Sequence, residues 1–373
     1  MSCGEPSGDL YAAELVRQLR ARTPDLTVLG VGGDRLEGEG AKLLAHIGDL
    51  AVVGLLEVLR HIPAIRRVFR QVVAALDRER PDLAVLIDYP DFNLRLAREL
   101  KQRGIPVVYY VSPQVWAWKR RRIRTIRETV SRMLVIFAFE EALYRDAGVP
   151  VTYVGHPLVD LVRPAPDRDA FLRDLGLDPQ RPVLALLPGS RPMEVRNNLA
   201  PILGAVRRIL DERPNAQFLL PAAPLLDPAS LGSLCAGLPV RLVTGQSHAS
   251  VGAADVAIVA SGTATVETAL LGTPMVVVYR VAPLTYMLGR PLIKVPHFAM
   301  VNLIAEREVV PELMQRDFTP ERLAAETLSL LSNASRRERM RDDLAEVRRR
   351  LGAAGATARA ADIVATFLPP PRA

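Results

Sequence analysis

The sequence predicts an α/β protein built from two doubly wound parallel-sheet domains and a C-terminal helical tail. Short runs rich in Val, Ile and Leu alternate with segments of helical periodicity, over residues 26–154 and again over residues 183–278. Such runs are typical of parallel strands that helices cover on both faces. The length of 373 residues is also sufficient for two domains, each with a full core.

The elements of the first half follow a regular order. We expect strands at residues 26–31, 83–87, 105–111, 133–137 and 151–154. Helical patterns fall between them, at residues 10–22, 55–76, 94–103, 123–132 and 140–146. Because helices separate consecutive strands, these strands should form one parallel sheet.

The same alternation restarts after a proline-rich, polar linker at residues 163–167. We expect strands at residues 183–187, 218–220, 240–243, 256–259 and 274–278, and helices at residues 194–212, 264–271 and 320–331. Residues 335–367 are helical in pattern and dense in arginine. This organisation predicts domains at residues 1–160 and 161–345, and a helical tail at residues 346–373 that packs back across the domains.

The first strand of the N-terminal domain is unusually short in the sequence. The glycine-rich loop Gly4–Asp9 should follow a central strand, yet only Met1–Cys3 precede it. We expect either a vestigial strand or a true start upstream, and favour the upstream start.

Charge and cysteine content limit the function classes. The net charge is +7, only four of the 48 cations are lysine, and the pI is near 9.7, which favours an anionic partner. The two cysteines, Cys3 and Cys235, are too far apart for a disulfide framework and indicate a cytosolic protein. No signal peptide is evident, and uncharged stretches are too short to span a bilayer, so we expect any membrane contact to be peripheral.

Several common cofactor and metal motifs are missing. No lysine follows a glycine, as a phosphate-binding P-loop requires, and the run Gly30–Arg35 lacks the third glycine of a dinucleotide fingerprint. Neither a G-x-S-x-G elbow nor an HExxH motif occurs, and the five histidines show no ligand spacing. We therefore expect neither a cofactor nor a metal.

The loops after predicted strands should carry the function, because doubly wound sheets bind ligands at the carboxyl ends of their strands. In Leu86-Ile-Asp88-Tyr-Pro-Asp91-Phe-Asn93, two carboxylates and an amide follow a buried strand. Partial burial can adjust the pKa of an aspartate so that it acts as a general base, and we expect this of Asp88. Asp91 is better interpreted as a helix cap.

A second loop, Leu187-Pro-Gly189-Ser190-Arg191, lies between a strand and a helix. This order predicts free backbone N–H groups around an anion, and Arg191 adds a bidentate charge. The loop therefore predicts a phosphate site without metal, although Ser190 could instead be a simple helix cap.

A third loop contains Ser261, Gly262 and Thr263, small residues that let a ligand approach the backbone. Glu267 lies about one helical turn further on, where its carboxylate could accept hydrogen bonds from both hydroxyls of a ribose. The alternative is a carboxylate that only stabilises the helix N-terminus.

Two further segments combine apolar and basic residues. Trp116 and Trp118 precede the four consecutive cations of residues 119–122. In the helix predicted at residues 55–76, apolar residues recur at i, i+3, i+4 and i+7 with arginines on the other side. Both patterns are typical of interfacial surfaces. Periodicity alone, however, favours a helix whose apolar side packs on the sheet.

Together these segments resemble the lipid-A-disaccharide synthase family, inverting glycosyltransferases of the GT-B architecture with two Rossmann-like domains. The ordered matches are Gly4-Glu-Pro-Ser-Gly-Asp9, Gly54-Leu-Leu-Glu-Val58, Ile87-Asp-Tyr-Pro-Asp-Phe-Asn93, Tyr110-Val-Ser-Pro-Gln-Val-Trp-Ala-Trp118, Leu186-Leu-Pro-Gly-Ser-Arg191, Ala260-Ser-Gly-Thr-Ala264 with Glu267, and Asn302-Leu. Such an ordered set is far more specific than any one run.

The resemblance implies transfer of a sugar from UDP-2,3-diacylglucosamine to 2,3-diacylglucosamine 1-phosphate, which gives a β-1,6-linked disaccharide 1-phosphate and UDP without a metal. Asp88 and Arg191 would be the catalytic residues. The donor would be bound by Gly189, Ser190, Arg191, Ser261, Gly262, Thr263, Glu267 and Asn302. The acceptor would be bound by Gly4, Glu5, Ser7, Gly8, Trp118 and Arg120.

The resemblance also changes the interpretation of the amphipathic helix, whose apolar residues would form an exposed acyl-binding or membrane-contacting face. These residues are Leu56, Val58, Leu59, Ile62 and Ile65. The implied location is the cytoplasm, peripherally on the cytoplasmic face of the inner membrane, and a homodimer is left open.

Two alternatives remain. A different two-domain UDP-sugar enzyme, either a MurG-like transferase or a UDP-sugar 2-epimerase, would share the nucleotide site. A non-catalytic basic module that binds nucleic acid would need more basic residues interleaved with aromatic ones than Trp116–Arg122 provide. We therefore expect no nucleic-acid partner.

Overall fold

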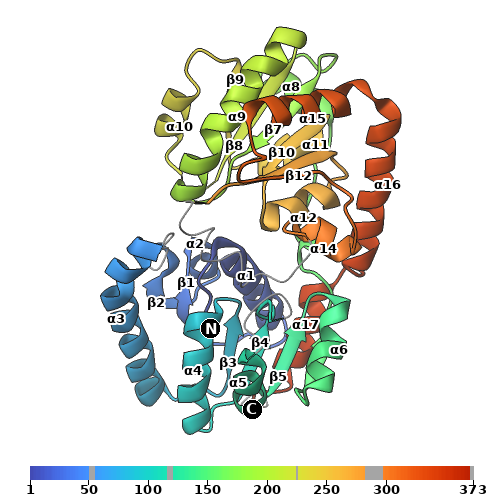
Figure 1. The fold of residues 1–373 in the computed structure, drawn as a ribbon. Coiled ribbons are helices and arrows are strands. Elements are labelled where there is room, and N and C mark those ends of the chain that lie inside the picture. Colours follow the sequence, from blue (N-terminus) through green and yellow to red (C-terminus); the bar gives the residue numbers. More distant parts are fainter. Residues whose placement is uncertain (50–54, 116–120, 224–225, 282–296, 370–373) are drawn as a thin grey trace. The chain divides into compact units, whose positions relative to one another are not determined.

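A computed structural model of the chain describes residues 1–49, 55–115, 121–223, 226–281 and 297–369 (Figure 1). For residues 55–61 it describes the backbone alone. The chain forms two compact units: an N-terminal unit of Met1–Asp160 with Leu351–Ala373, and a C-terminal unit of Leu161–Arg350. Each unit contains a parallel sheet with helices packed against it, as the sequence predicts.

The N-terminal unit alternates helices and short strands. Its strands are β1 (Leu29–Gly32), β2 (Lys42–His46), β3 (Ala84–Ile87), β4 (Val107–Tyr110), β5 (Arg132–Val135) and β6 (Val151–Tyr153). Its helices are α1 (Pro6–Arg20), α2 (Asp34–Gly38), α3 (Leu55–Glu79), α4 (Pro90–Gln102), α5 (Arg122–Thr129), α6 (Ala138–Asp146), α7 (Leu158–Leu161) and α17 (Ala356–Ala365).

Residues Met1–Cys3 act as a short central strand of this sheet. Ser2 forms parallel bridges to Val31 of β1 and to Leu86 of β3. The Cys3 N–H donates to the Val31 carbonyl at 3.0 Å, and the Ile87 N–H donates to the Ser2 carbonyl at 2.8 Å. The sheet order is therefore β2, β1, Met1–Cys3, β3, β4, β5, β6, with all pairs parallel.

The hydrophobic core of the N-terminal unit explains why these runs form strands. All four residues of β3 and all four of β4 are buried, so both sides of each strand lie against apolar side chains. Helices α3 and α4 contribute apolar residues such as Val72 and Leu100 to the same cluster. By contrast, β2 is only partly buried, and its shorter apolar signal left it unpredicted.

The C-terminal unit repeats the plan. Its strands are β7 (Val183–Leu187), β8 (Gln217–Ala222), β9 (Val240–Thr244), β10 (Val256–Ala260), β11 (Met275–Tyr279) and β12 (Glu312–Met314). Its helices are α8 (Arg168–Asp174), α9 (Pro192–Glu212), α10 (Pro228–Leu234), α11 (Ser247–Ala253), α12 (Thr263–Leu270), α14 (Met300–Ala305), α15 (Pro320–Ser332) and α16 (Ala334–Arg350).

The C-terminal sheet has the order β12-β11-β10-β7-β8-β9, and every neighbouring pair is parallel. From β7 the chain first builds outward to β8 and β9, and then returns to β10 on the other side of β7. The topological switch point, where ligands bind in doubly wound sheets, therefore lies between β7 and β10.

The arginine-rich C-terminal region is divided between the two units. Helix α16 belongs to the C-terminal unit, whereas α17 packs on α1 of the N-terminal unit. The carboxylate of Asp160 accepts hydrogen bonds from the Gly355 and Ala356 N–H groups, at 2.7 and 3.0 Å, and so caps α17. Arg22 on the N-terminal unit bonds Asp362 of α17 at 2.7 Å.

Candidate active site

At the switch point of the N-terminal sheet, two of the predicted motifs come into contact. The chain leaves Met1–Cys3 toward β1 and β2 on one side and returns to β3 on the other, so the loops after Cys3 and after Ile87 are neighbours. A Cβ added to Gly4 would lie 2.3 Å from Cγ of Tyr89, so only glycine fits beneath that ring. The glycine-rich loop and the Asp88 segment therefore form one structure.

The backbone at Asp88 is held in an unusual conformation. Asp88 and Tyr89 have φ of +47° and +48°, in the left-handed region that bulky residues rarely adopt. The Asp88 carbonyl accepts hydrogen bonds from the Tyr109 hydroxyl at 2.5 Å and from Asn93 Nδ2 at 2.8 Å. Strain of this kind costs on the order of 1–3 kcal/mol per residue and is concentrated at functional sites. The turn places the half-buried Asp88 at the carboxyl edge of the sheet.

Asn93 and Asp9 support this edge from inside the unit. The fully buried Asn93 amide accepts from Ser2 Oγ at 2.7 Å and also donates to the Ile87 carbonyl. The buried Asp9 carboxylate accepts from the N–H groups of Gly33, Arg35 and Leu36 and thereby caps α2. Sequence reasoning did not assign Asp9, although a helix start at Gly33 requires such an acceptor.

A further buried pair follows β4. Ser112 Oγ donates to Glu140 Oε1 at 2.5 Å, and Glu140 is 1% exposed. Val111 has a φ of +63°, which is unusual for a β-branched residue. Sequence reasoning missed Glu140. The predicted acceptor residues Trp118 and Arg120 lie outside the described residues, whereas Glu5 and Ser7 lie half-buried beside Gly4.

In the C-terminal unit, the switch point joins two predicted donor-binding loops. Val259 of β10 pairs with Leu187 of β7, so the loops that follow these strands leave the sheet side by side. The first contains Gly189, Ser190 and Arg191, and the second contains Ser261, Gly262 and Thr263.

The first loop differs from its prediction in one respect. The Ser190 and Arg191 N–H groups, which we expected to be free for an anion, donate to Glu194 Oε2 at 2.9 and 3.3 Å. Arg191 Nη1 lies 3.3 Å from Glu194 Oε1. The cause is a capping interaction, in which a carboxylate one turn into α9 folds back on the helix start.

Tyr279 and Asn198 complete the surroundings of this loop. Burial raises the pKa of Tyr279, and the Glu194 carboxylate raises it further while Arg191 acts in the opposite direction. The fully buried Asn198 donates from Nδ2 to the Pro188 carbonyl at 2.9 Å and accepts from the Arg280 N–H at 3.1 Å. It thereby links the loops that follow β7 and β11.

The second loop rises into α12 as predicted, with Gly262 at the N-cap position with a φ of +155°. Ser261 Oγ donates to the Phe298 carbonyl at 3.1 Å. Glu267, 25% exposed, lies 3.7 Å from Nε2 of His248 on α11. Sequence reasoning did not connect His248 with this site, because the two residues are on different helices.

Asn302 does not have the position expected of a donor-binding side chain. It is fully buried, and its Oδ1 accepts from the Val309 and Val310 N–H groups at 2.8 and 3.0 Å. Its Nδ2 donates to Glu312 Oε1 at 2.7 Å. All of its hydrogen-bonding capacity is used within the unit, so it shapes the loop around α14 rather than facing a ligand.

The apolar stripe on α3 is only partly described. The side chains of Leu56, Val58 and Leu59 lie outside the described residues, and Ile62 is half-buried. Ile65 is also half-buried and packs against the hydrophobic core of the N-terminal unit, whereas we expected it on an exposed face. The reason is that this part of the stripe turns toward the sheet, as most amphipathic helices do.

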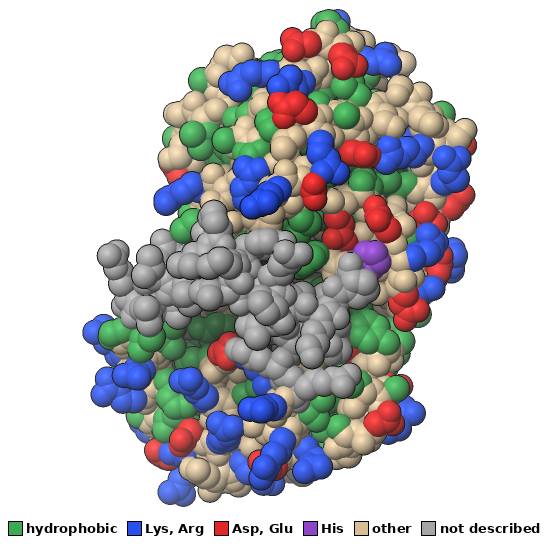
Figure 2. Space-filling model, in the orientation of Figure 1, with side chains coloured by type: hydrophobic (Ala, Val, Ile, Leu, Met, Phe, Trp, Pro, Cys, Tyr) green, Lys and Arg blue, Asp and Glu red, His purple; other side chains and the backbone are tan. Residues whose placement is uncertain are grey.

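The outer side of α3 is basic. Its residues Arg66, Arg67 and Arg70 are exposed. Figure 2 shows lysine and arginine side chains on the visible face of both units. Within the described part of the chain, no helix is sufficiently long and apolar to span a membrane. Nor do any three His, Cys, Asp or Glu side chains there gather as metal ligands would.

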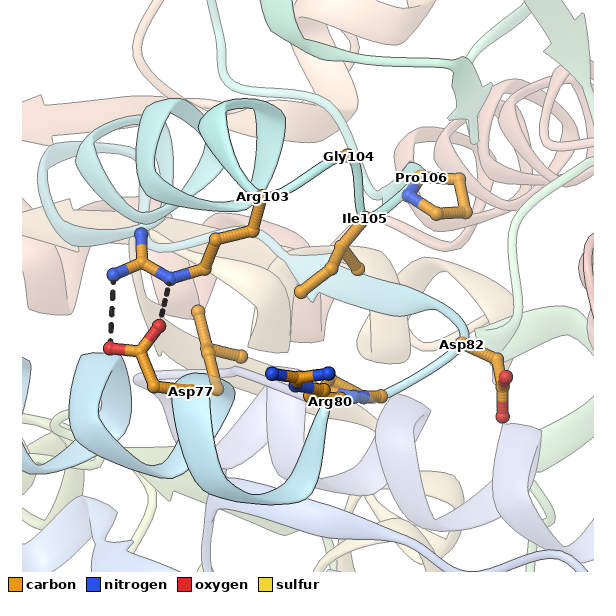
Figure 3. Close-up of a pocket in the computed structure, with 9 residues that line it drawn as sticks. Asp77, Arg80, Asp82, Arg103, Gly104, Ile105 and Pro106 are labelled. Carbon is orange, nitrogen blue, oxygen red and sulfur yellow. Dashed lines mark hydrogen bonds and ion pairs between the residues drawn. The ribbon is translucent and has the colours of Figure 1, made fainter.

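A cavity of about 560 Å³ lies at the opposite edge of the N-terminal sheet (Figure 3). It is lined by residues before β3 and β4, including Asp82 and Pro106, and by the ends of α3 and α4. Arg103 forms two hydrogen bonds with Asp77, of 2.7 and 3.2 Å, and these bonds lower the pKa of Asp77. None of the predicted site residues lines this cavity, and it faces the amino ends of the strands.

Comparisons with known proteins identify the family. Residues 1–367 match the family model described as lipid-A-disaccharide synthetase. A lipid-A-disaccharide synthase from Myxococcus xanthus is 49% identical over 99% of this chain and 97% of its own length. One from Syntrophus aciditrophicus is 47% identical over 98% of this chain and 96% of its own length.

A solved structure shows the same fold. The UDP-GlcNAc 2-epimerase from Neisseria meningitidis, bound to UDP-GlcNAc, has a TM-score of 0.64 and 12% identity, and the match covers 96% of this chain and 97% of the epimerase. At that identity the similarity concerns the fold, and it agrees with the predicted GT-B architecture. The family model and the relatives, which match along nearly the whole chain, show that the chain belongs to the lipid-A-disaccharide synthase family of glycosyltransferases.

Proposed function

We propose that the two switch-point sites divide the reaction between them, with the acceptor on the N-terminal unit and the UDP-sugar donor on the C-terminal unit. As a member of its family, the chain is a glycosyltransferase of lipid A biosynthesis. The donor is UDP-2,3-diacylglucosamine and the acceptor is 2,3-diacylglucosamine 1-phosphate. The products are the β-1,6-linked disaccharide 1-phosphate and UDP.

Asp88 is the proposed general base. Its carboxylate takes the proton of the acceptor 6-hydroxyl while that oxygen attacks C1 of the donor sugar from the face opposite to UDP. The bond between C1 and the phosphate oxygen breaks, and its electrons leave with UDP. The left-handed backbone, fixed through the carbonyl by Tyr109 and Asn93, supports this role because it fixes the direction in which the side chain leaves the backbone.

Arg191 is the proposed electrophilic residue. As the sugar–phosphate bond breaks, negative charge grows on the diphosphate, and a guanidinium at the switch point stabilises that charge. Ser190 and Gly189 bring the backbone close to the phosphates. The arginine thereby does the work that a metal ion does in other nucleotide-sugar enzymes.

The loop after β10 is the proposed nucleoside site. Ser261, Gly262 and Thr263 allow close approach of the ligand, and Glu267 accepts hydrogen bonds from the ribose hydroxyls. The partial exposure of Glu267 supports this role, because its carboxylate remains reachable.

One observation carries the proposal. In each sheet the two motifs singled out from the sequence follow the two strands that flank the switch point: Gly4–Gly8 with Asp88, and Gly189–Arg191 with Ser261–Thr263. These four loops thus lie where doubly wound folds bind their ligands.

Association with the cytoplasmic face of the inner membrane is part of the proposal. The exposed arginines of α3, with Arg120, would meet acidic head groups. The apolar residues at the start of the same helix, with Trp118, would meet acyl chains. A homodimer is compatible with this arrangement.

The function is tested by incubating the purified protein with both diacylglucosamine substrates and measuring UDP and disaccharide. The proposal expects equal amounts of the two products and no UDP without acceptor. A UDP-sugar 2-epimerase would instead invert the configuration at C2 of a soluble UDP-sugar without any lipid acceptor, and that result would refute the proposal.

A further inference from the structure

The loop that we assign to the diphosphate already holds an anion, the carboxylate of Glu194. Glu194 Oε2 accepts from the Ser190 N–H at 2.9 Å and from the Arg191 N–H at 3.3 Å, and Oε1 lies 3.3 Å from Arg191 Nη1. Two adjacent backbone donors and a guanidinium are the groups that bind a phosphate at a helix start. A side chain of α9 therefore occupies the place predicted for the ligand.

Gly189 makes this arrangement possible. It has a φ of +134°, and a Cβ at this position would lie 2.4 Å from Cβ and 2.7 Å from Oε2 of Glu194. Any other residue would push the carboxylate away from the loop. The glycine at residue 189 therefore serves Glu194 as well as the approach of a ligand.

The loop does not depend on Glu194 alone. Asn198, one turn further along α9, holds the Pro188 carbonyl at 2.9 Å and is itself fixed by the Arg280 N–H. Glu194 accepts its hydrogen bonds from the N–H groups of the loop and the guanidinium. Its side chain is 19% exposed, so it can turn toward solvent. The carboxylate can thus leave while Asn198 keeps the loop in place.

We propose that Glu194 is a positioning residue whose carboxylate serves as an exchangeable internal anion. When UDP binds, a phosphate replaces the carboxylate as the acceptor of hydrogen bonds from Ser190 and Arg191, and the carboxylate returns to them as UDP leaves. The inference rests on the proposed function. It implies that the negative charge of Glu194 lies beside the bound diphosphate and weakens the UDP complex, which assists product release.

An ordinary helix cap predicts a different outcome. Glutamine can serve at this capping position, because its one side-chain oxygen accepts the hydrogen bonds from the two backbone N–H groups. Glu194→Gln therefore preserves the backbone cap and removes the charge, together with the oxygen that faces Arg191 Nη1. If Glu194 is simply a cap, this variant should bind UDP as the wild type does.

The test is UDP binding by isothermal titration calorimetry at low salt. We expect Glu194→Gln to bind UDP about tenfold more tightly than wild type, since repulsion between like charges a few ångströms apart is lost. The KM for the donor should fall, and UDP should become a stronger product inhibitor. Glu212→Gln, an exposed position at the other end of α9, makes the same charge change and should leave UDP affinity unaltered.

Unchanged or weaker UDP binding by Glu194→Gln, with wild type binding UDP normally, would overturn this inference and leave the proposed function intact. Failure of wild type to bind UDP would overturn the proposed function itself. An independent test that needs no variant is the structure of the UDP complex. There the Ser190 and Arg191 N–H groups should contact a phosphate, and a retained Ser190–Glu194 hydrogen bond would contradict the exchange.

Discussion

The ring of Tyr89 lies directly over Gly4, so that a Cβ on residue 4 would come within 2.3 Å of the ring. Residue 4 follows Met1–Cys3 and Tyr89 follows Asp88, so this contact joins the glycine-rich loop to the proposed base. The contact also explains why residue 4 is a glycine, because any side chain would displace the aromatic ring next to the proposed base.

Gly4→Ala should therefore lower turnover about tenfold or more, because small displacements of a catalytic group are costly. Turnover and thermal melting should be measured together, and the melting temperature should change little. Gly38→Ala is the control, since a Cβ there meets nothing within 4 Å. Equal activity of Gly4→Ala and wild type would show that the Tyr89 position does not matter for Asp88.

Asp88→Asn should reduce kcat by about 10²-fold or more, because an amide cannot accept the proton of the acceptor hydroxyl. Binding of UDP should be unaffected, as Asp88 lies on the N-terminal unit. Asp91→Asn provides the comparison: Asp91 is on the first turn of α4, is exposed, and pairs with Arg122. Comparable losses in both variants would remove the specific role of Asp88.

Arg191→Ala should lower turnover by about 10²-fold or more and weaken UDP binding, because the charge on the departing diphosphate loses its partner. Arg191→Lys should recover only part of the activity, since an ammonium lacks the bidentate geometry. Steady-state kinetics and UDP calorimetry test both effects. A fully active Arg191→Ala variant would refute the assigned role.

His156 should make the N-terminal unit less stable in mild acid. Burial lowers the pKa of His156 from 6.5 to about 3, so between these values the unfolded chain binds a proton that the folded protein does not. The free energy of unfolding should thus fall as the pH decreases below 6.5, by up to about 1.4 kcal/mol per pH unit.

Urea unfolding followed by far-UV circular dichroism can measure this slope from pH 6.5 to about 5. His156→Gln should flatten it, whereas His46→Gln, which changes a more exposed histidine, should leave it in place. An undiminished slope in His156→Gln would contradict the assignment to His156.

The membrane proposal predicts different effects for two sets of serine substitutions on α3. Replacing Val58, Leu59 and Ile62 with serine should move the enzyme from vesicles of acidic phospholipid into the supernatant of a flotation assay, because apolar contact is lost. Ile65→Ser should instead lower the melting temperature, since Ile65 packs on the core. A wild-type enzyme that never floats with the vesicles would end the interfacial proposal.

The fold class and most of the central strands could be predicted from the sequence, because a buried parallel strand appears there as a continuous apolar run. Strand β7 was predicted residue for residue, and β10 and β11 to within one residue at each end. The edge strands β2 and β12 were missed. Only partly buried, they carry a short and mixed pattern.

The candidate site could be predicted as motifs but not as contacts. The sequence could indicate that Asp88 and Arg191 follow strands. It could not indicate that Glu194 accepts hydrogen bonds from the loop of Arg191, or that Asn302 donates to Glu312. Such pairings depend on how helices return to the sheet, which periodicity does not specify. The strained turn at Asp88 likewise arises from tertiary hydrogen bonds with Tyr109 and Asn93.

The most direct test of the central claim is a single-turnover reaction with UDP-2,3-diacylglucosamine and 2,3-diacylglucosamine 1-phosphate, in which wild type and Asp88→Asn are compared. Wild type should form disaccharide 1-phosphate and UDP in equal amounts, and the variant should bind both substrates yet form at least about 10²-fold less per unit time. Disaccharide formation at the wild-type rate by Asp88→Asn would contradict the account.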